Sequence, residues 1–237
     1  MIGKGSGLLL IDIGVILFSI GLMLLLNKYI KGDKHLTLLL GIGTGVCGAA
    51  AIAAISPIIK SREKDSAISI GIVALIGTIF SLAYTVIYSV FTISPEVFGV
   101  WSGTSLHEIA HVILAADFSG QAALSIGLLG KLGRVFLLIP LSIILILIMR
   151  FKSQGETEKK RIDVPYFLLG FVMMALFHTY VPLPHMVMQI IDNVTTICLL
   201  MAMVALGLNV SFKDLKDRAF KPLIVVIVVS ILSLIHI

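Results

Sequence analysis

Hydrophobic residues along this chain fall into long, almost uninterrupted runs that short polar segments separate. Most of the runs are too long for a single strand, and several approach the roughly 20 residues that an α-helix needs to cross a bilayer. This pattern predicts an all-α, polytopic helical membrane protein. The apolar runs lie at about 8–26, 36–59, 67–91, 104–116, 135–149, 164–181, 186–210 and 223–237.

The composition of the 237-residue chain supports the same class of protein. Hydrophobic residues make up 58% and charged residues only 13%, with a mean hydropathy of +1.10. A soluble domain carries about 25% charged residues, so an ordinary water-soluble core is excluded. We therefore expect a multi-pass protein of the cell inner (plasma) membrane, surrounded by the lipid bilayer. The net charge of +5 does not indicate a nucleic-acid partner, because the basic residues lie in short loops between apolar runs.

The distribution of lysine and arginine predicts which loops face the cytoplasm. Segments 92–103 and 182–186 contain neither residue, so we expect them outside the cell. Four connections are basic and are expected in the cytoplasm: 28–34, 60–66, 150–161 and 213–221.

These loop positions are inconsistent with a chain in which every apolar run is a simple span. Run 36–59 has basic loops at both ends. Two runs separate the outside loop 92–103 from the inside loop 150–161, where an odd number of crossings is needed. As a helix, run 104–116 would reach only about 20 Å, against a hydrocarbon core of about 30 Å. Either some segments are broken, re-entrant or crossed, or the positive-inside rule fails locally.

Two apolar segments carry residues that favour a break in the helix. Segment 41–57 contains four closely spaced glycines, and segment 192–210 begins with polar residues and ends in small, flexible ones. Each Gly costs about 1 kcal/mol relative to Ala in a helix interior. Discontinuous helices carry the substrate sites of inverted-repeat transporters, whereas close packing by small residues needs no ligand. Both interpretations stay open for 41–57, and Asp192 favours a functional role for 192–210.

The stretch 107–111, "HEIAH", matches the H-E-x-x-H pattern of zinc hydrolases. On a helix, His107 and His111 project from one face and could bind zinc, while Glu108 could activate a metal-bound water. Intramembrane zinc proteases usually take a third ligand from an Asp that Gly follows. The candidate aspartates lack this context: Asp117, Asp163 and Asp192.

Three longer segments resemble the YeiH family, to which sulfate export is ascribed. They are "DKHLTLLLGIGTGVCGAAAIAAISPIIK" (33–60), "SPEVFGVWSGTSLHEIAHVILAA" (94–116) and "LLMAMVALGLNVSFKDLK" (199–216). The resemblance extends over about residues 8–232. In that family, His-Glu-hydrophobic-Ala is followed by Gln or His. A Gln at the position of His111 would be a poor zinc ligand, so the resemblance weakens the zinc interpretation.

The resemblance implies an inverted-repeat transporter fold, similar to bile-acid/sodium symporters and cation/proton antiporters. Two broken helices that cross near the membrane centre would then correspond to 41–57 and 192–210. We expect a secondary transporter, not an enzyme, that exports a small inorganic or organosulfur anion such as sulfate. The coupling ion would be a proton or sodium, and we expect no cofactor and no resident metal. The alternatives are an intramembrane zinc metalloprotease and a structural or regulatory membrane protein without transport activity.

Polar residues around the HEIAH stretch are the main candidates for function. A buried carboxylate beside imidazoles can take up and release a proton, or it can simply hold a re-entrant helix in the bundle. We expect residues 102–111 to form a short, polar-faced helix that enters the membrane from the outside. The hydroxyls upstream would cap this helix or donate to an oxyanion. The candidates for a substrate and proton pathway are Thr44, Cys47, Ser102, Thr104, Ser105, His107, Glu108, His111, Asp192, Asn193, Thr195 and Thr196.

The two ends of the chain carry separate expectations. We predict a single transmembrane domain over 1–231, followed by a tail at 232–237. The last six residues, "LSLIHI", can be translated from CTG TCT CTT ATA CAC ATC, which resembles a transposase sequencing adapter. Because members of the family extend further at the N-terminus, we also expect this chain to lack the opening helices of the first repeat.

Overall fold

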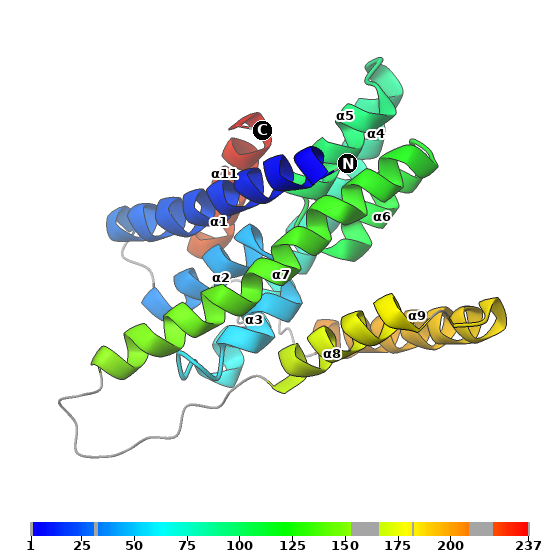
Figure 1. Ribbon diagram of the computed structural model, residues 1–237. Helices are drawn as coiled ribbons and strands as arrows, with labels where there is room; N and C mark the ends of the chain where they lie inside the picture. The colour runs from blue at the N-terminus through cyan, green and yellow to red at the C-terminus, as the bar shows by residue number, and fades with distance from the viewer. Residues whose placement is uncertain (1, 31–32, 153–165, 182, 209–219, 237) are drawn as a thin grey trace.

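The apolar runs form α-helices in the computed structural model, which describes residues 2–30, 33–152, 166–181, 183–208 and 220–236. All regular secondary structure within these ranges is helical, which confirms the predicted fold class (Figure 1). The helices are α1 (Ile2–Ile30), α2 (Lys34–Gly45), α3 (Ala49–Ile55), α4 (Glu63–Val90), α5 (Pro95–Ser105), α6 (Ile109–Asp117), α7 (Gln121–Lys152), α8 (Tyr166–Tyr180), α9 (His185–Leu208) and α11 (Phe220–His236).

Three of the described helices are long and apolar enough to cross a membrane. The candidate spans are Leu9–Tyr29 in α1, Glu63–Val90 in α4 and Gln121–Met149 in α7. Helix α7 begins well before the apolar run 135–149. Lys131 and Arg134 interrupt the hydrophobic pattern before this run, but the helix continues through them and both side chains are buried. These helices support the prediction of a membrane protein.

A three-residue break separates α2 from α3 and confirms the interruption predicted for this glycine-rich segment. Helix α2 ends at Gly45 and α3 begins at Ala49. The connecting Gly48 has a φ of +70°, a conformation that glycine adopts readily. Asp33 caps α2 and also accepts a 2.7 Å hydrogen bond from Arg62, which directly precedes α4. Both ends of the α2–α3 segment therefore lie at the same end of α4, so this segment is a re-entrant hairpin.

A second break separates α5 from α6 and corrects the prediction of one short helix over residues 102–111. Residues 106–108 are not helical, so the HEIAH stretch is divided between the break and the first turn of α6. Near the end of α4, the ring centroid of Tyr88 lies 4.7 Å from that of Phe98 in α5 and 6.4 Å from that of Phe118 after α6. The α5–α6 segment is therefore a hairpin that opens at the other end of α4.

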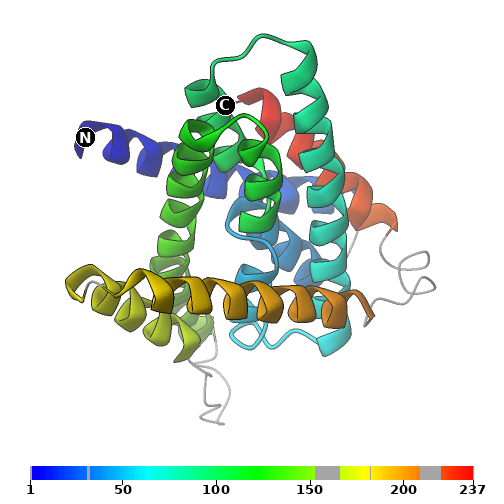
Figure 2. The same cartoon turned by 90° about the vertical axis from the view of Figure 1, so that its right-hand side faces the viewer.

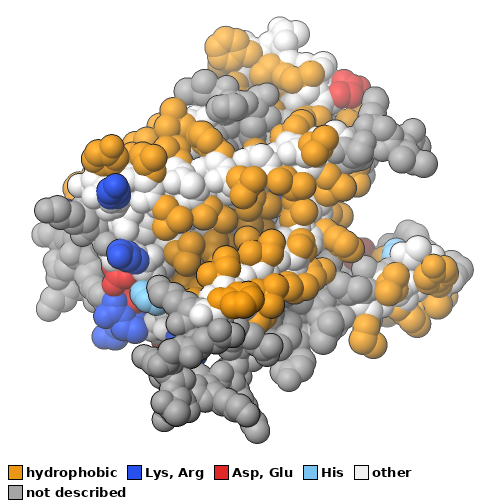
Figure 3. All heavy atoms as spheres, turned by 60° about the vertical axis from the view of Figure 1, so that its left-hand side comes forward, with side chains coloured by type: hydrophobic (Ala, Val, Ile, Leu, Met, Phe, Trp, Pro, Cys, Tyr) orange, Lys and Arg blue, Asp and Glu red, His pale blue; other side chains and the backbone are white. Residues whose placement is uncertain are grey.

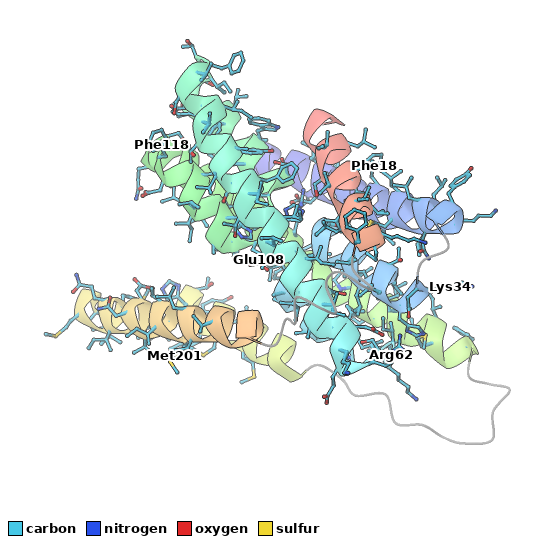
Figure 4. The ribbon with its side chains drawn as sticks, turned by 180° about the vertical axis from the view of Figure 1, so that it is seen from behind. Phe18, Lys34, Arg62, Glu108, Phe118 and Met201 are labelled. Carbon is cyan, nitrogen blue, oxygen red and sulfur yellow. The ribbon has the colours of Figure 1, made fainter. Side chains whose placement is uncertain are left out.

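The opposite orientation of these two hairpins removes the inconsistency in the loop charges. Figure 4 shows Arg62 at one end of α4, Phe118 towards the other, and Glu108 between them. Because α2–α3 returns to the side from which it starts, basic loops can precede and follow it on that side. Because α5–α6 also returns, α7 supplies the single crossing that the next basic loop requires.

Small residues let each hairpin pack closely against a long helix. A Cβ added to Gly103 of α5 would overlap the backbone of Gly127 in α7. A Cβ added to Gly41 of α2 would lie 3.2 Å from the Cβ of Met23 in α1. Such close approaches are typical of helix pairs in membranes. Figures 1 and 2 show the resulting bundle, in which α1, α7 and α11 surround the hairpins.

Helix α9 is continuous from His185 to Leu208, which corrects the predicted break over 192–210 for its described part. Residues 209 and 210 lie outside the described residues. Figure 2 shows α9 running across one side of the main bundle, where it contacts α4. Nearly all described side chains of α9 are exposed.

Basic side chains gather at one end of the surface shown in Figure 3, and hydrophobic side chains cover much of the remaining described area. Lys28 at the end of α1, Lys34 at the start of α2 and Arg62 before α4 all belong to the loops predicted to be cytoplasmic. This separation of charged and apolar surface is the pattern expected of a protein embedded in a bilayer.

Candidate functional site

The tips of the two hairpins meet through a hydrogen bond between Glu108 and the backbone of α3. The N–H of Ala49 donates to Glu108 Oε1 at 2.9 Å, and Glu108 is only 6% exposed. Gly48 lies directly against this side chain, because a Cβ added there would overlap the carboxyl group. The first N–H groups of a helix have no partner within the helix, so the start of α3 offers a donor that Glu108 accepts from.

Two buried imidazoles flank Glu108 and are held by different helices. His107 Nε2 lies 2.9 Å from the hydroxyl of Ser230 in α11. His111 Nε2 lies 3.3 Å from the hydroxyl of Thr78 in α4. Gly77 makes room for the second ring, since a Cβ there would overlap it. The Nδ1 atoms of both histidines are buried and have no hydrogen-bond partner among the described residues.

Three further charged side chains lie buried beside the hairpins. Asp12 in α1 accepts a 2.9 Å hydrogen bond from Arg134 Nε in α7, and both residues are 0% exposed. Lys131, one turn earlier in α7, donates to the carbonyl oxygen of Leu106 in the second break. Electrostatic interactions connect Lys131 with Arg134, Asp12 and Glu108. Ionisable groups inside a membrane protein are costly, and they commonly mark a substrate or proton pathway.

The hydroxyls predicted to cap a helix N-terminus lie instead at the C-terminal end of α5. Each one donates to a carbonyl oxygen three or four positions earlier in its own helix, because the chain stays helical up to the break. This holds for Ser102, Thr104 and Ser105 in α5 and for Thr44 in α2. Ser105 also contacts the hydroxyl of Tyr84 in α4. In this conformation, the protons of these hydroxyls are therefore engaged by carbonyl groups of their own helices.

The remaining candidates divide between the two breaks and α9. Cys47 is 6% exposed and lies in the first break, close to the hairpin tips. The four candidates of α9 are exposed and lie apart from the tips, because the continuous α9 remains beside the bundle: Asp192, Asn193, Thr195 and Thr196.

The zinc interpretation requires His107 and His111 on one face of one helix. Helix α6 begins only at Ile109, so His107 lies outside it, and the two Nε2 atoms contact α11 and α4. Within the described ranges, no group of three or more His, Cys, Asp or Glu side chains is placed to hold a metal ion. The geometry therefore gives the H-E-x-x-H match no support as a metal site.

The two hairpin tips repeat one local pattern of helix ends. Residues 43–54 and 103–114 align without gaps, 60 positions apart, and both begin with Gly-Thr. In each copy, the first helix ends two residues after the Gly and the second begins four residues after that end. Gly48 of the first copy and Glu108 of the second occupy equivalent positions, and these two residues contact each other. An inverted repeat of the whole chain remains a prediction.

Sequence reasoning missed four residues of the cluster: Asp12, Lys131, Arg134 and Ser230. The signal for three of them was present, because a charged residue within a membrane-spanning segment is itself a candidate for function. The position of Ser230 beside His107 depends on the packing of α11 and carries no local sequence signal. The Gly-Thr repeat was a further signal, and it marks both breaks.

These features define a polytopic helical membrane protein with two opposed re-entrant hairpins in its core. The chain belongs to the UPF0324 family of membrane proteins, which confirms its resemblance to YeiH-type proteins. A family model described as "Conserved hypothetical protein 698" matches residues 1–226.

The relatives found by comparison are also named as membrane proteins. A UPF0324 membrane protein of Staphylococcus aureus strain MRSA252 is 67% identical over 231 residues, which cover 98% of this chain and 70% of the relative. A UPF0324 membrane protein of Staphylococcus epidermidis strain RP62A is 60% identical over the same shares of both chains. No solved structure matches this chain significantly.

Proposed function

We propose that this protein is a secondary transporter that exports a small anion across the plasma membrane, with Glu108 as the carrier of a coupled proton. The hydrogen bond between Glu108 and Ala49 carries the proposal, because it places a protonatable group where two opposed hairpins meet. Discontinuous helices that meet within the membrane are a recurring way to build a transport site. Movement of either tip would break this contact and open the site towards one side.

The buried charges support an anion that moves together with a proton. Lys131 and Arg134 contribute two formal positive charges, and Asp12 and Glu108 contribute two negative charges. A monovalent anion added to this cluster would leave one negative charge uncompensated, and sulfate would leave two, which is costly in a medium of low polarity. A proton on Glu108 would remove one of these charges. Asp12 is less suited to accept it, because its carboxylate is already paired with Arg134.

Sulfate is the substrate that the family resemblance favours, and an organosulfur anion belongs to the same class. The same resemblance leaves sodium as the alternative coupling ion. We propose transport and no enzymatic role, as the family resemblance implies; the division of the two histidines between the second break and α6 supports this proposal.

Reconstitution of the full chain in liposomes tests this function. We expect labelled sulfate to accumulate when a proton gradient is imposed and to stop accumulating when a protonophore is added. In a Glu108→Gln variant, the amide oxygen can still accept from Ala49 N–H, but the side chain cannot carry a proton. We therefore expect this variant to keep its thermal stability and lose the gradient-driven uptake.

Glu63→Gln is the matched control, because Glu63 is an exposed carboxylate at the start of α4. This control should transport as the unmodified protein does. Unchanged uptake in Glu108→Gln would contradict the role of Glu108. No sulfate flux under proton or sodium gradients would contradict sulfate transport. Stoichiometric zinc that disappears in His111→Gln would instead favour a metalloprotease.

A further inference from the structure

The guanidinium of Arg134 is the least satisfied charged group in the described part of the protein. Its Nε donates to Asp12 Oδ1 at 2.9 Å, but Nη1 and Nη2 are buried and have no hydrogen-bond partner among the described residues. Asp12 Oδ2 likewise has no partner there. A buried donor of a charged group that lacks an acceptor is strongly unfavourable. Such a group in a membrane core indicates that an acceptor is bound in another state of the protein.

The geometry of the Asp12–Arg134 pair leaves one edge of the guanidinium free. A bidentate pair would use both carboxylate oxygens, whereas Asp12 uses only Oδ1 and contacts only Nε. The terminal edge, formed by Nη1 and Nη2, presents parallel N–H groups that match two oxygens of an oxyanion. A single-atom anion such as chloride cannot satisfy both N–H groups in the same way.

The position of Arg134 connects this edge to the hairpin tips. Lys131 is one turn away on α7 and donates to Leu106 in the second break. Gly133 lies against Asp12, since a Cβ there would be 2.8 Å from Asp12 Oδ2. Because Arg134 is fully buried here, an anion can reach it only after the surrounding helices separate. The site is thus closed in this conformation and lies beside the parts that would move.

We propose that Nη1 and Nη2 of Arg134 bind the transported anion, and that Asp12 is a positioning residue that holds the guanidinium through Nε. This inference rests on the proposed transport function and adds the residue that recognises the substrate. The ligand it predicts is a small oxyanion with two oxygens available to one guanidinium, and the side chain of Lys131 lies one turn away in α7. Glu108, by contrast, carries the proton and does not contact the anion.

Binding of labelled sulfate to the purified full chain in detergent tests the site independently of transport. We expect saturable binding that unlabelled sulfate displaces and an equal concentration of chloride does not. Arg134→Lys keeps the charge but loses the forked donor, so the affinity for sulfate should fall at least about tenfold, the loss expected for one charge-assisted hydrogen bond. Arg62→Lys, a change at an exposed arginine, should leave the affinity unchanged.

The double variant Asp12→Asn/Arg134→Gln gives a second readout. It removes both charges together, so no unpaired charge remains buried, and its melting temperature should stay close to that of the unmodified protein. We expect it to bind no sulfate. If this variant does not fold, the affinity of Arg134→Lys decides the question.

Two results would overturn the site. One is unchanged sulfate affinity in Arg134→Lys or in a folded double variant, and the other is the absence of sulfate binding to the unmodified protein. Flux that persists in the double variant would reject the site and leave the transport function standing. Saturable, Arg134-dependent binding without flux in liposomes would retain the site and reject the transport function.

Discussion

Gly48 is the residue whose conformation and surroundings most restrict substitution. Its φ of +70° disfavours any side chain, and its missing Cβ leaves the space that the Glu108 carboxyl group occupies. Both constraints act at the point where the hairpins meet. The equivalent position in the second copy of the motif holds Glu108 itself, so one copy supplies a charge and the other supplies the space for it.

We predict that Gly48→Ala destabilises the protein by about 1–3 kcal/mol, because a non-glycine residue in this backbone conformation is strained and the added Cβ displaces Glu108. The measurement is the melting temperature of the purified protein in detergent. Gly14→Ala is the control, because no atom lies within 4 Å of a Cβ placed at Gly14 in α1. Equal melting temperatures for the two variants would contradict this account of the tip.

At the scale of the helices, close contacts between α5 and α7 hold the second hairpin in place. Gly99 and Gly103 of α5 face the backbone of Ala123 and Gly127 in α7. Without a hydrophobic driving force between helices in lipid, such packing is a main source of association. The orientation of the second hairpin therefore depends in part on small residues that have no polar side chain.

We predict that Gly103→Ala lowers the melting temperature, because the new methyl group overlaps the backbone of Gly127 and overpacking typically costs about 1–3 kcal/mol. Gly130→Ala, on α7, is the matched change. Its nearest contact would be 3.7 Å, an ordinary distance, so the better helix propensity of Ala should leave stability unchanged or raise it by up to about 1 kcal/mol. A loss of stability in Gly130→Ala equal to that in Gly103→Ala would contradict this interpretation.

The sequence predicts the helices, the break near Gly48 and the need for re-entrant segments, because hydrophobic run length, glycine content and loop charge are local properties. The second break cannot be predicted from local sequence, because "HEIAH" contains good helix formers. This break is instead stabilised by two tertiary contacts: Glu108 accepts a hydrogen bond from Ala49, and Lys131 donates one to the carbonyl oxygen of Leu106. In α9, the small residues do not break the helix. The ion pair of Asp12 and Arg134 joins residues 122 positions apart, which no local pattern predicts.

For the whole molecule, the hairpins predict which surface segments face the same side of the membrane. Lys34 and Lys64 border the first hairpin, and Val97 and Phe118 border the second. All four side chains are exposed. Because each hairpin returns to the end of α4 at which it starts, we expect each pair to share one side of the membrane and the two pairs to face opposite sides.

Labelling with a membrane-impermeant maleimide tests this arrangement. Each of the four positions is changed to a single cysteine in a background that carries Cys47→Ser and Cys198→Ser. We expect labelling of Val97→Cys and Phe118→Cys in intact cells. Labelling of Lys34→Cys and Lys64→Cys should require permeabilised cells, because the basic loops are cytoplasmic. Labelling of the two residues of one pair from opposite sides would show that this segment crosses the membrane.

The length of helix α4 sets the distance between the two hairpins. This helix has 28 residues, or a length of about 42 Å, and it is the only helix between the two hairpins along the chain. One extra turn would lengthen it by about 5 Å, which is more than the contact between Ala49 and Glu108 can absorb. We therefore expect insertions to be tolerated in the surface loops but not in α4. A change in the length of α4 would need a matching change in the length of the hairpins.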